Sequence, residues 1–427
     1  MNIARGIFGV LVLTGILYLM SNNKKSISWN MVLKGLAMQW ILAIGVLKVN
    51  WISAMFDQIS KAAVTLLNFT REGSLFLFGS LIEDIDSMGY IFAFQVLPTI
   101  IFFAALTSML YYWGILQKVV KVMAWIMQKT LKLSGAESLA AAGNIFLGQT
   151  EAPLLVKPYI EKMTKSELMS LMSGGMATIA GGVLAAYIGY LGGTDEAQQL
   201  FFAKHLITAS VLSAPAAIIS AKILVPETEP IVETASISTE SMGANVLDAI
   251  SRGTTQGVKL AVNVGAMLLV FTAMVYGFNT IITSIGEWAG LNEWAAKVSG
   301  GQYQAFNFQF ILGQLFSPIS WLLGVHSSDL ALVGQLIGEK TVLNEFYAYV
   351  TLSDLQSAGA FTSKRSVILA TYILCGFANI ASIGIQIGGI GVLAPSRRAD
   401  LSKLGVRALI AGTVASFYTA AIVATII

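Results

Sequence analysis

The sequence predicts an all-α integral membrane protein with eight transmembrane helices, two re-entrant helical hairpins, interfacial helices and an inverted repeat. Three observations support this fold class. The 427-residue chain is 56% hydrophobic and only 11% charged, whereas about a quarter of a soluble chain is charged. Its apolar residues form segments long enough to cross a bilayer, which takes ~20 residues in a helix. A short motif also occurs twice, once in each half of the chain.

Eight apolar segments are long enough to be transmembrane spans. They lie near residues 3–20, 31–53, 91–115, 167–191, 200–222, 258–287, 365–393 and 405–427. The first apolar run, Ile7–Met20, has the length of a signal-peptide core. Because no small-residue cleavage site follows it, we expect it to be retained as the first span.

The positions of lysine and arginine predict the orientation of the spans. Clusters follow the first and third spans and precede the last, at Lys24, Lys25, Lys118, Lys121, Lys129, Lys132, Arg397, Arg398 and Lys403. Cytoplasmic loops carry an excess of these residues, so both termini are expected outside the cytoplasm. Lys364 and Arg365 are an exception, because this topology places them outside as well.

The longest polar segment divides the chain into two halves. Residues 223–257 contain Pro226-Glu227-Thr228-Glu229-Pro230 and are expected to be a cytoplasmic linker. The predicted organisation is 1–90 for the N-terminal spans and an interfacial helix, 91–222 for the first repeat, 223–257 for the linker and 258–427 for the second repeat. Each repeat is expected to hold a scaffold span, a re-entrant hairpin and two further spans.

Three apolar regions contain charged residues or helix-breaking residues that a simple transmembrane span would lack. Residues 57–80 mix charged and apolar positions, which favours an amphipathic helix in the membrane interface. Residues 131–163 are broken by Gly143, Gly148 and Pro153, and residues 325–361 are broken around Asn344-Glu345. Each of these two is predicted to enter and leave the membrane as two half-helices with a polar tip. Irregular backbone is tolerated at that depth only where protein or a water-filled cavity surrounds it.

The repeated motif pairs Gly175–Gly181 with Gly376–Ser382. Each copy falls within a predicted span and follows a predicted hairpin by a similar interval. An odd number of crossings separates the copies, so they are expected to run in opposite directions through the membrane. Inverted repeats with broken helices are typical of secondary transporters, whose binding site lies at the midplane.

Two polar groups lie at these interruptions. Gln149, Thr150 and Glu151 form the first, and their donors and acceptors suit the edge of a planar heterocycle. Glu345, Asn379 and Ser382 form the second, and they suit a polyhydroxylated group such as a sugar. An ionised group at bilayer depth costs roughly 2.5–3.5 kcal/mol, which favours ligand binding. The alternatives are a polar network that stabilises the first turn and a helix-packing network for the second group.

A monovalent cation is the third expected ligand. Asn144, Thr178 and the carbonyls of Leu147 and Ile179 could supply the oxygen atoms that sodium requires. The single cysteine, Cys375, excludes an intrachain disulfide, and two histidines do not suggest a metal centre. The net charge of +3, without a basic patch, does not suggest nucleic-acid binding.

Several short motifs resemble those of the concentrative nucleoside transporter family in its bacterial form. They are Gly-Gln-Thr-Glu-Ala-Pro-Leu at 148–154, Asn-Val-Gly-Ala-Met at 263–267, Asn-Glu-Phe at 344–346, Gly-Phe-Ala-Asn at 376–379 and Ala-Pro-Ser-Arg-Arg at 394–398. The resemblance covers nearly the whole chain. It implies a homotrimer that moves nucleosides such as uridine, cytidine and adenosine together with a cation.

The resemblance also implies residue roles. Gln149, Thr150 and Glu151 match the nucleobase-binding set, with Val183 packing on the base. Glu345, Asn379 and Ser382 match the ribose set, with Phe377 beside them. Asn144, Leu147, Thr178 and Ile179 match the sodium site. The chain departs from the family at two positions: Thr178 stands where Ser is frequent, and His326 stands where the second hairpin usually begins with Pro.

The expected function is therefore sodium-coupled symport of nucleosides into the cell by alternating access, in the bacterial inner membrane. The third and sixth spans are the expected scaffold. Proton coupling through a buried glutamate is the alternative within this class. An intramembrane enzyme using Glu151 and Glu345 is another, but no nucleophile motif or cofactor loop accompanies them. A channel would not require two different recognition sets.

Overall fold

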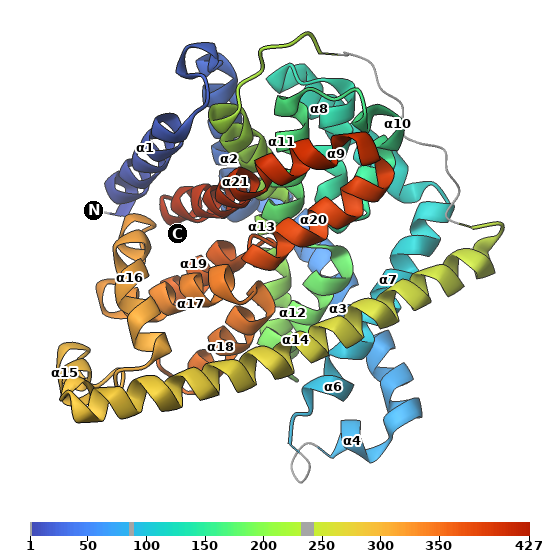
Figure 1. Cartoon of the computed structure of the whole chain (residues 1–427). Coiled ribbons are helices and arrows are strands. Elements are labelled where there is room, and N and C mark those ends of the chain that lie inside the picture. Colours follow the sequence, from blue (N-terminus) through green and yellow to red (C-terminus); the bar gives the residue numbers. More distant parts are fainter. Residues whose placement is uncertain (1, 85–88, 232–242) are drawn as a thin grey trace.

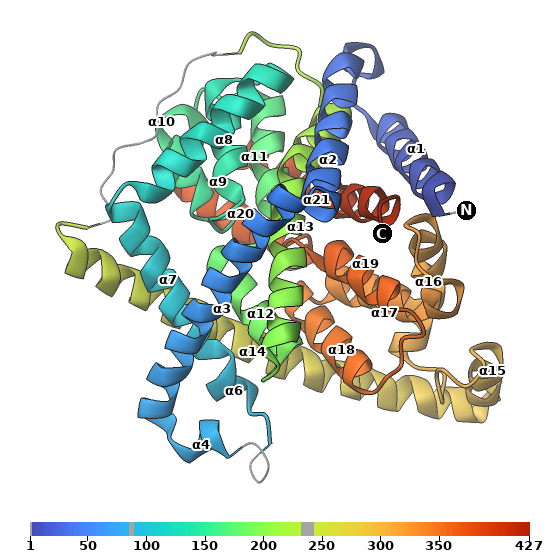
Figure 2. The ribbon, with the colours of Figure 1, turned by 180° about the vertical axis from the view of Figure 1, so that it is seen from behind.

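The computed structural model describes residues 2–84, 89–231 and 243–427, and within these ranges all regular secondary structure is helical. Figures 1 and 2 show a central group of helices with a single long helix, α14, running across one side. The described helices that could span a membrane by length and composition are α1 (Asn2–Met20), α2 (Trp29–Lys48), α6–α7 (Phe92–Gln95, Leu97–Tyr112), α11–α12 (Lys165–Ala177, Gly181–Gly192), α13 (Glu196–Leu224), α14 (Val246–Trp288) and α21 (Arg398–Ala424).

The seventh expected span, 365–393, is divided into two shorter helices. These are α19 (Lys364–Leu374) and α20 (Ile380–Leu393). The expected span 167–191 is divided in the same way, between α11 and α12. The divisions fall on the two copies of the repeated motif. The repeat therefore marks a pair of broken helices, which is the arrangement expected of an inverted-repeat transporter.

The two breaks touch each other. Gly376 has a φ of +101°, a conformation that L-residues with a side chain rarely adopt. A Cβ atom at this position would lie 2.6 Å from the carbonyl carbon and oxygen of Ala177. Glycine at 376 therefore permits both the turn of the backbone and the close approach of the two repeats.

Gly376→Ala is expected to destabilise the protein, because alanine adds backbone strain of about 1–3 kcal/mol and a clash with Ala177. The melting temperature of the detergent-solubilised protein should fall. Gly384→Ala is the control, since a Cβ atom on Gly384 in α20 would have no described atom within 4 Å. Alanine in a helix interior is favoured over glycine, so an equal loss in both variants would contradict this account.

Two helical hairpins flank the breaks. The second consists of α17 (Leu330–Val342) and α18 (Glu345–Ser357), joined by two residues. The first has one full arm, α9 (Gly135–Asn144), and a return arm made of a 3₁₀ turn (Ala152–Val156) and α10 (Lys157–Ile160). The return arm is thus shorter than a half-helix, because Pro153 and Pro158 lack the backbone N–H that a continuous α-helix uses.

The second hairpin begins with a 3₁₀ turn at Ser327–Asp329, preceded by His326 where the resemblance implies a proline. His326 has a φ of −61°, which a proline would also adopt, and its Nδ1 accepts a hydrogen bond from Ser328 N at 3.4 Å. The carboxylate of the buried Asp329 accepts bonds from Thr362 N and Ser363 N at 2.9 and 3.1 Å. The helix start is therefore fixed by polar contacts of the chain itself.

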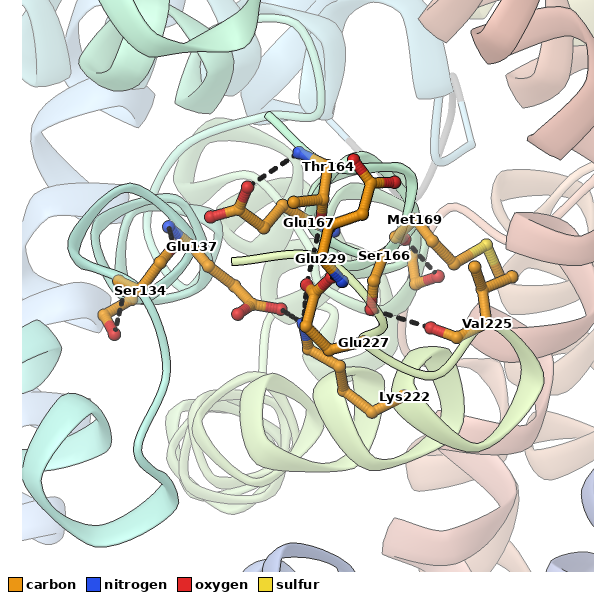
Figure 3. Close-up of polar contacts among 12 residues, drawn as sticks. Ser134, Glu137, Thr164, Ser166, Glu167, Met169, Lys222, Val225, Glu227 and Glu229 are labelled. Carbon is orange, nitrogen blue, oxygen red and sulfur yellow. Dashed lines mark hydrogen bonds and ion pairs between the residues drawn. The ribbon is translucent and has the colours of Figure 1, made fainter. Parts of the chain in front are cut away.

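Two ion pairs of the buried Lys222 fix the base of the first hairpin (Figure 3). Lys222 Nζ, at the end of α13, lies 2.9 Å from Glu137 Oε1 and 3.3 Å from Glu227 Oε2. Thr164 Oγ1 donates to the same Glu227 oxygen at 2.8 Å and also forms a capping box with Glu167 at the start of α11. The base of the hairpin is thereby tied to α11 and α13.

Some boundaries differ from those expected. The span predicted at 31–53 ends at Lys48, because Val49 is extended, and α3 (Asn50–Phe78) begins earlier than the interfacial helix predicted at 57–80. Asn245 caps α14, whose first turns lie within the range assigned to the linker. Residues 232–242 of that range lie outside the described residues. The remaining helices are α4 (Ser80–Glu83), α8 (Ile115–Leu131), α15 (Leu291–Val298) and α16 (Phe308–Leu322).

Burial separates a core from a periphery. In its most apolar window α13 is 89% buried, and it packs against α11, α12 and α21, whereas α14 is only 17% buried and lies along α7. The start of α1 also meets the end of α21, since a Cβ on Gly6 would lie 2.6 Å from Thr425 Cγ2 (Figure 1). Both ends of the described chain therefore lie on the same side of the molecule.

Candidate functional site

The hairpin tips and the helix breaks bring the two predicted polar groups together. Glu345 stands at the tip of the second hairpin, and Asn379 caps α20 by accepting a hydrogen bond from Ser382 N at 2.9 Å. Asn379 Nδ2 donates to Glu345 Oε2 at 2.7 Å. All three side chains are buried. The expected ribose set is therefore one hydrogen-bonded cluster, although its members lie on two different elements.

A hydrogen bond joins this cluster to the first hairpin. Gln149 Nε2 donates to Ser382 Oγ at 3.2 Å, while Gln149 Oε1 is buried without a partner among the described residues. Gln149 therefore links the residues predicted to read a heterocycle with those predicted to read a sugar at one polar surface. The unpartnered oxygen is a buried acceptor that a ligand could satisfy.

Two further polar side chains belong to this surface and were missed from the sequence. Tyr187 OH donates to Glu345 Oε1 at 3.4 Å. Gln386 Nε2 donates to Met172 O at 2.9 Å, and its Oε1 lacks a partner within the described part of the chain. Tyr187 follows Val183 by one helical turn, and Gln386 follows Ser382 by one turn. Spacing by four residues, which places side chains on one helix face, could have identified both.

Glu151 and Thr150 face a cavity instead of the buried cluster. The cavity measures about 370 Å³ and is lined on one side by Leu147, Thr150, Glu151 and Val183. Its other walls are α7 and α14, and they include Gln256, Lys259 and Asn263. Pockets of roughly 300–1,000 Å³ hold small-molecule ligands. Glu345, Asn379 and Ser382 do not line this cavity, and Gln149, the chain neighbour of Thr150, contacts Ser382.

The carboxylate of Glu151 is held close to the turn that precedes it. A Cβ atom on Gly148 would lie only 2.1 Å from Glu151 Oε2. The same position would be 3.4 Å from the Cβ atom of Ala180, at the break between α11 and α12. Any side chain at 148 would therefore displace the carboxylate, which explains the need for glycine in this turn.

The predicted cation ligands gather at the same break. Asn144 is 1% exposed at the end of α9, and neither its Nδ2 nor its Oδ1 has a partner among the described residues. A Cβ atom on Gly174 would lie 2.6 Å from Asn144 Nδ2, and Thr178 Oγ1 donates to Gly174 O at 2.9 Å. Leu147 and Ile179 are buried beside them. An orphaned amide oxygen, a hydroxyl and nearby carbonyls are hard oxygen donors, which suit sodium.

Phe377 and Val183, which were predicted to pack beside the ligand, are also buried. Phe377 lies in the break between α19 and α20, and Val183 lies in the first turn of α12 and lines the cavity. All eight residues predicted to bind substrate thus lie at the hairpin tips, at the breaks or in the first turn of the helix that follows each break. The four predicted cation ligands lie at the tip of the first hairpin and the break that it contacts.

Three family descriptions match the chain. Residues 8–81 match the N-terminus and residues 205–424 match the C-terminus of the Na⁺-dependent nucleoside transporters, and residues 93–194 match the nucleoside recognition domain. An uncharacterized transporter of Haemophilus influenzae is 41% identical over 99% of this chain and 97% of its own length. Human solute carrier family 28 member 3 is 39% identical over 97% of this chain, which spans 58% of that longer protein.

Solved structures agree with these matches over the full chain. The structure of CNTnw in an inward-facing, substrate-bound state has a TM-score of 0.90 and 38% identity, and it covers 100% of this chain and 98% of its own. A CNTnw variant in an outward-facing state also has a TM-score of 0.90, with 37% identity over 100% of this chain and 98% of its own. These relatives are transporters and not enzymes. The chain therefore belongs to the family of Na⁺-dependent nucleoside transporters.

Proposed function

We propose that this protein carries nucleosides into the cell together with sodium, by alternating access. One observation carries the proposal: the Gln149–Ser382 hydrogen bond joins a sugar-type and a base-type recognition set next to an orphaned oxygen ligand set. A nucleoside has a ribose with hydroxyl donors and a base with a polar edge. Carboxylate, amide and hydroxyl groups lie on both sides of the Gln149–Ser382 hydrogen bond, and they suit such a ligand.

The ribose is proposed to bind at Glu345, Asn379 and Ser382, with Phe377 beside it. Glu345 already accepts hydrogen bonds from Asn379 and Tyr187. A carboxylate has about four acceptor sites, so ribose hydroxyls can donate to the same oxygens. Bonds to an ionised acceptor are the stronger kind, which makes Glu345 the main determinant of affinity for any nucleoside.

The base is proposed to bind at Gln149, Thr150 and Glu151, with Val183 against its face. Thr150, Glu151 and Val183 line the cavity, whereas Glu345, Asn379 and Ser382 do not. The base would therefore face the cavity, where it can vary in size.

Sodium is proposed to bind at Asn144, Thr178 and the carbonyls of Leu147 and Ile179. The same turn of chain carries Asn144 and Gln149, and both contact the end of α11: Asn144 lies against Gly174 and Gln149 against Gly175. A cation held between the hairpin tip and α11 would draw the tip onto the helix. The geometry of Gln149 would then depend on sodium, which couples ion and nucleoside binding. The retained amide at 144 and hydroxyl at 178 favour sodium over a proton.

Alternating access is proposed to move the hairpins, the broken helices, α13 and α21 against a scaffold that includes α7 and α14. The cavity lies at this boundary, and the exposed apolar surface of α14 can contact lipid or a second copy. Solved CNTnw structures in inward-facing, outward-facing and intermediate states have TM-scores of 0.88 to 0.90 with this chain. We further propose a homotrimer in the bacterial inner membrane with both termini outside the cytoplasm.

Counterflow in proteoliposomes tests the transport proposal. Vesicles loaded with unlabelled uridine should accumulate labelled uridine transiently, and the label should be recovered as intact nucleoside. Chemical change of the nucleoside would instead favour an enzyme built on Glu151 and Glu345. Adenosine and cytidine, tested in the same way, would define the range of substrates.

Base selectivity should depend on Gln149 and Thr150. In Gln149→Ala and Thr150→Ala, the affinities for uridine, cytidine, adenosine and inosine should change by different factors, because specificity is a difference of affinities. Competition of each nucleoside against labelled uridine measures the four inhibition constants. A common factor for all four would mean that these residues only support the hairpin.

A further inference from the structure

A buried lysine whose hydrogen-bond partners, among the described residues, include no carboxylate lies in the second hairpin. Lys340 of α17 is 2% exposed. Its Nζ donates to Ile373 O at 2.9 Å, Cys375 O at 3.1 Å and Ser416 Oγ at 3.3 Å. An ammonium group has three donors, so oxygen atoms satisfy all of them. Lysine is rarely buried unless it is paired, and here the partners are the last carbonyls of α19 and one hydroxyl of α21.

The carbonyl groups that Lys340 contacts have counterparts in the first repeat. When Gly175 is aligned with Gly376, Gly174 corresponds to Cys375 and Met172 corresponds to Ile373. Lys340 therefore bonds the C-terminal end of α19, the second-repeat counterpart of the end of α11. The C-terminus of a helix carries a partial negative charge and favours cations.

The corresponding end of α11 is contacted by neutral groups. Gln386 Nε2 bonds Met172 O, and Thr178 Oγ1 bonds Gly174 O. Asn144, the residue at the end of the hairpin arm that approaches Gly174, keeps an orphaned amide. Equivalent helix ends thus meet an ammonium in one repeat and an unsatisfied oxygen ligand in the other.

We propose that the Lys340 ammonium is the built-in cation of the second repeat, in the place that sodium takes in the first. This inference rests on the proposed sodium site. A tethered cation holds the end of α19 at all times, and α17, which carries it, leads through a two-residue turn directly to Glu345. The proposed ribose-binding residues Glu345 and Asn379 are then held in position without sodium, and only the position of Gln149 depends on the ion. The protein accordingly couples one sodium ion, not two, to each nucleoside.

The first test measures stoichiometry in the unmodified protein. Labelled sodium and labelled uridine fluxes are recorded together in proteoliposomes, and the expected ratio is one ion per nucleoside. Two ions per nucleoside would overturn the role of Lys340 while leaving sodium symport intact. Uridine flux without any sodium flux would instead refute the proposed function itself.

The second test replaces the cation by a neutral side chain of similar length, in Lys340→Met. Uridine affinity is expected to fall about tenfold or more, as for loss of charge-assisted bonds. The preference for uridine over 3′-deoxyuridine should also disappear, because Glu345 and Asn379 lose their support. The sodium-induced thermal shift without nucleoside should persist, since the first repeat is unchanged.

Thr341→Val is the matched control, because Thr341 is the next residue of α17 and its hydroxyl donates to Ile337 O of the same helix, at 2.8 Å. It should keep the wild-type affinity and the wild-type preference. A normal preference for uridine over 3′-deoxyuridine in Lys340→Met would contradict the proposal. If that variant does not fold, the stoichiometry of the unmodified protein still decides it.

Discussion

Replacing Glu345 by glutamine is expected to weaken the binding of every nucleoside by about tenfold or more, because hydrogen bonds to charged groups contribute roughly 1.5–3 kcal/mol. The amide removes the charge that ribose hydroxyls would meet and leaves one acceptor oxygen in place of two, so it cannot accept from both Asn379 Nδ2 and Tyr187 OH as Glu345 does. Because ribose is common to all nucleosides, uridine and adenosine should lose affinity by similar factors.

Equilibrium binding of uridine and adenosine to the purified protein measures this effect. Glu339→Gln is the matched control: Glu339 is another buried glutamate of the same hairpin, but it accepts a hydrogen bond from Gln335 at 2.9 Å and lies outside the proposed substrate set. Normal binding in Glu345→Gln, or an equal loss in Glu339→Gln, would remove Glu345 from the site.

Replacing Asn144 by leucine should abolish the effect of sodium on nucleoside binding. The change removes a ligand oxygen but keeps the approximate volume of the side chain. Because neither amide atom has a partner among the described residues, an apolar replacement should cost little stability in the absence of sodium. The affinity of the Asn144→Leu variant for uridine in a sodium buffer should therefore equal its affinity in a buffer in which choline replaces sodium.

Thr178 provides a pair of related variants. Thr178→Ser keeps the hydroxyl and should respond to sodium as the wild type does. In Thr178→Val, the sodium concentration that gives half of the maximal response should rise by about tenfold or more. Melting temperature and uridine affinity are measured over a series of sodium concentrations. A full sodium response in Asn144→Leu would place the ion elsewhere.

Composition was sufficient to predict the class of the fold and most of its helices. Hydropathy located α1, α2, α13, α14 and α21 within a few residues at most ends. It did not locate the break at Val49, since Lys48 and Asn50 are the only polar residues around it in an otherwise apolar stretch from Ile41 to Ile52. It also treated 365–393 as one span, although the repeated motif within it marked the break at Gly376. Whether a glycine packs a helix or ends it depends on φ, which hydropathy does not report.

The candidate site was proposed from residue chemistry more than from helix patterns. Polar groups in apolar surroundings drew attention to Gln149, Glu345 and Asn379, because buried polar atoms need partners, and their role in binding stays a prediction. Tyr187 and Gln386 were missed because each lies within a continuous apolar helix, where a single aromatic or amide residue gives little signal. The fold places them beside Glu345 and Gln149, and their four-residue spacing from Val183 and Ser382 is the one sequence signal that could have found them.

Uridine uptake driven by one imposed gradient at a time tests the central claim most directly. Proteoliposomes are given either an inward sodium gradient at equal pH or an inward proton gradient without sodium. The present account predicts concentrative uptake with the sodium gradient and only equilibration with the proton gradient. Concentrative uptake driven by protons alone, with no response to sodium, would contradict the assignment of Asn144 and Thr178 as sodium ligands.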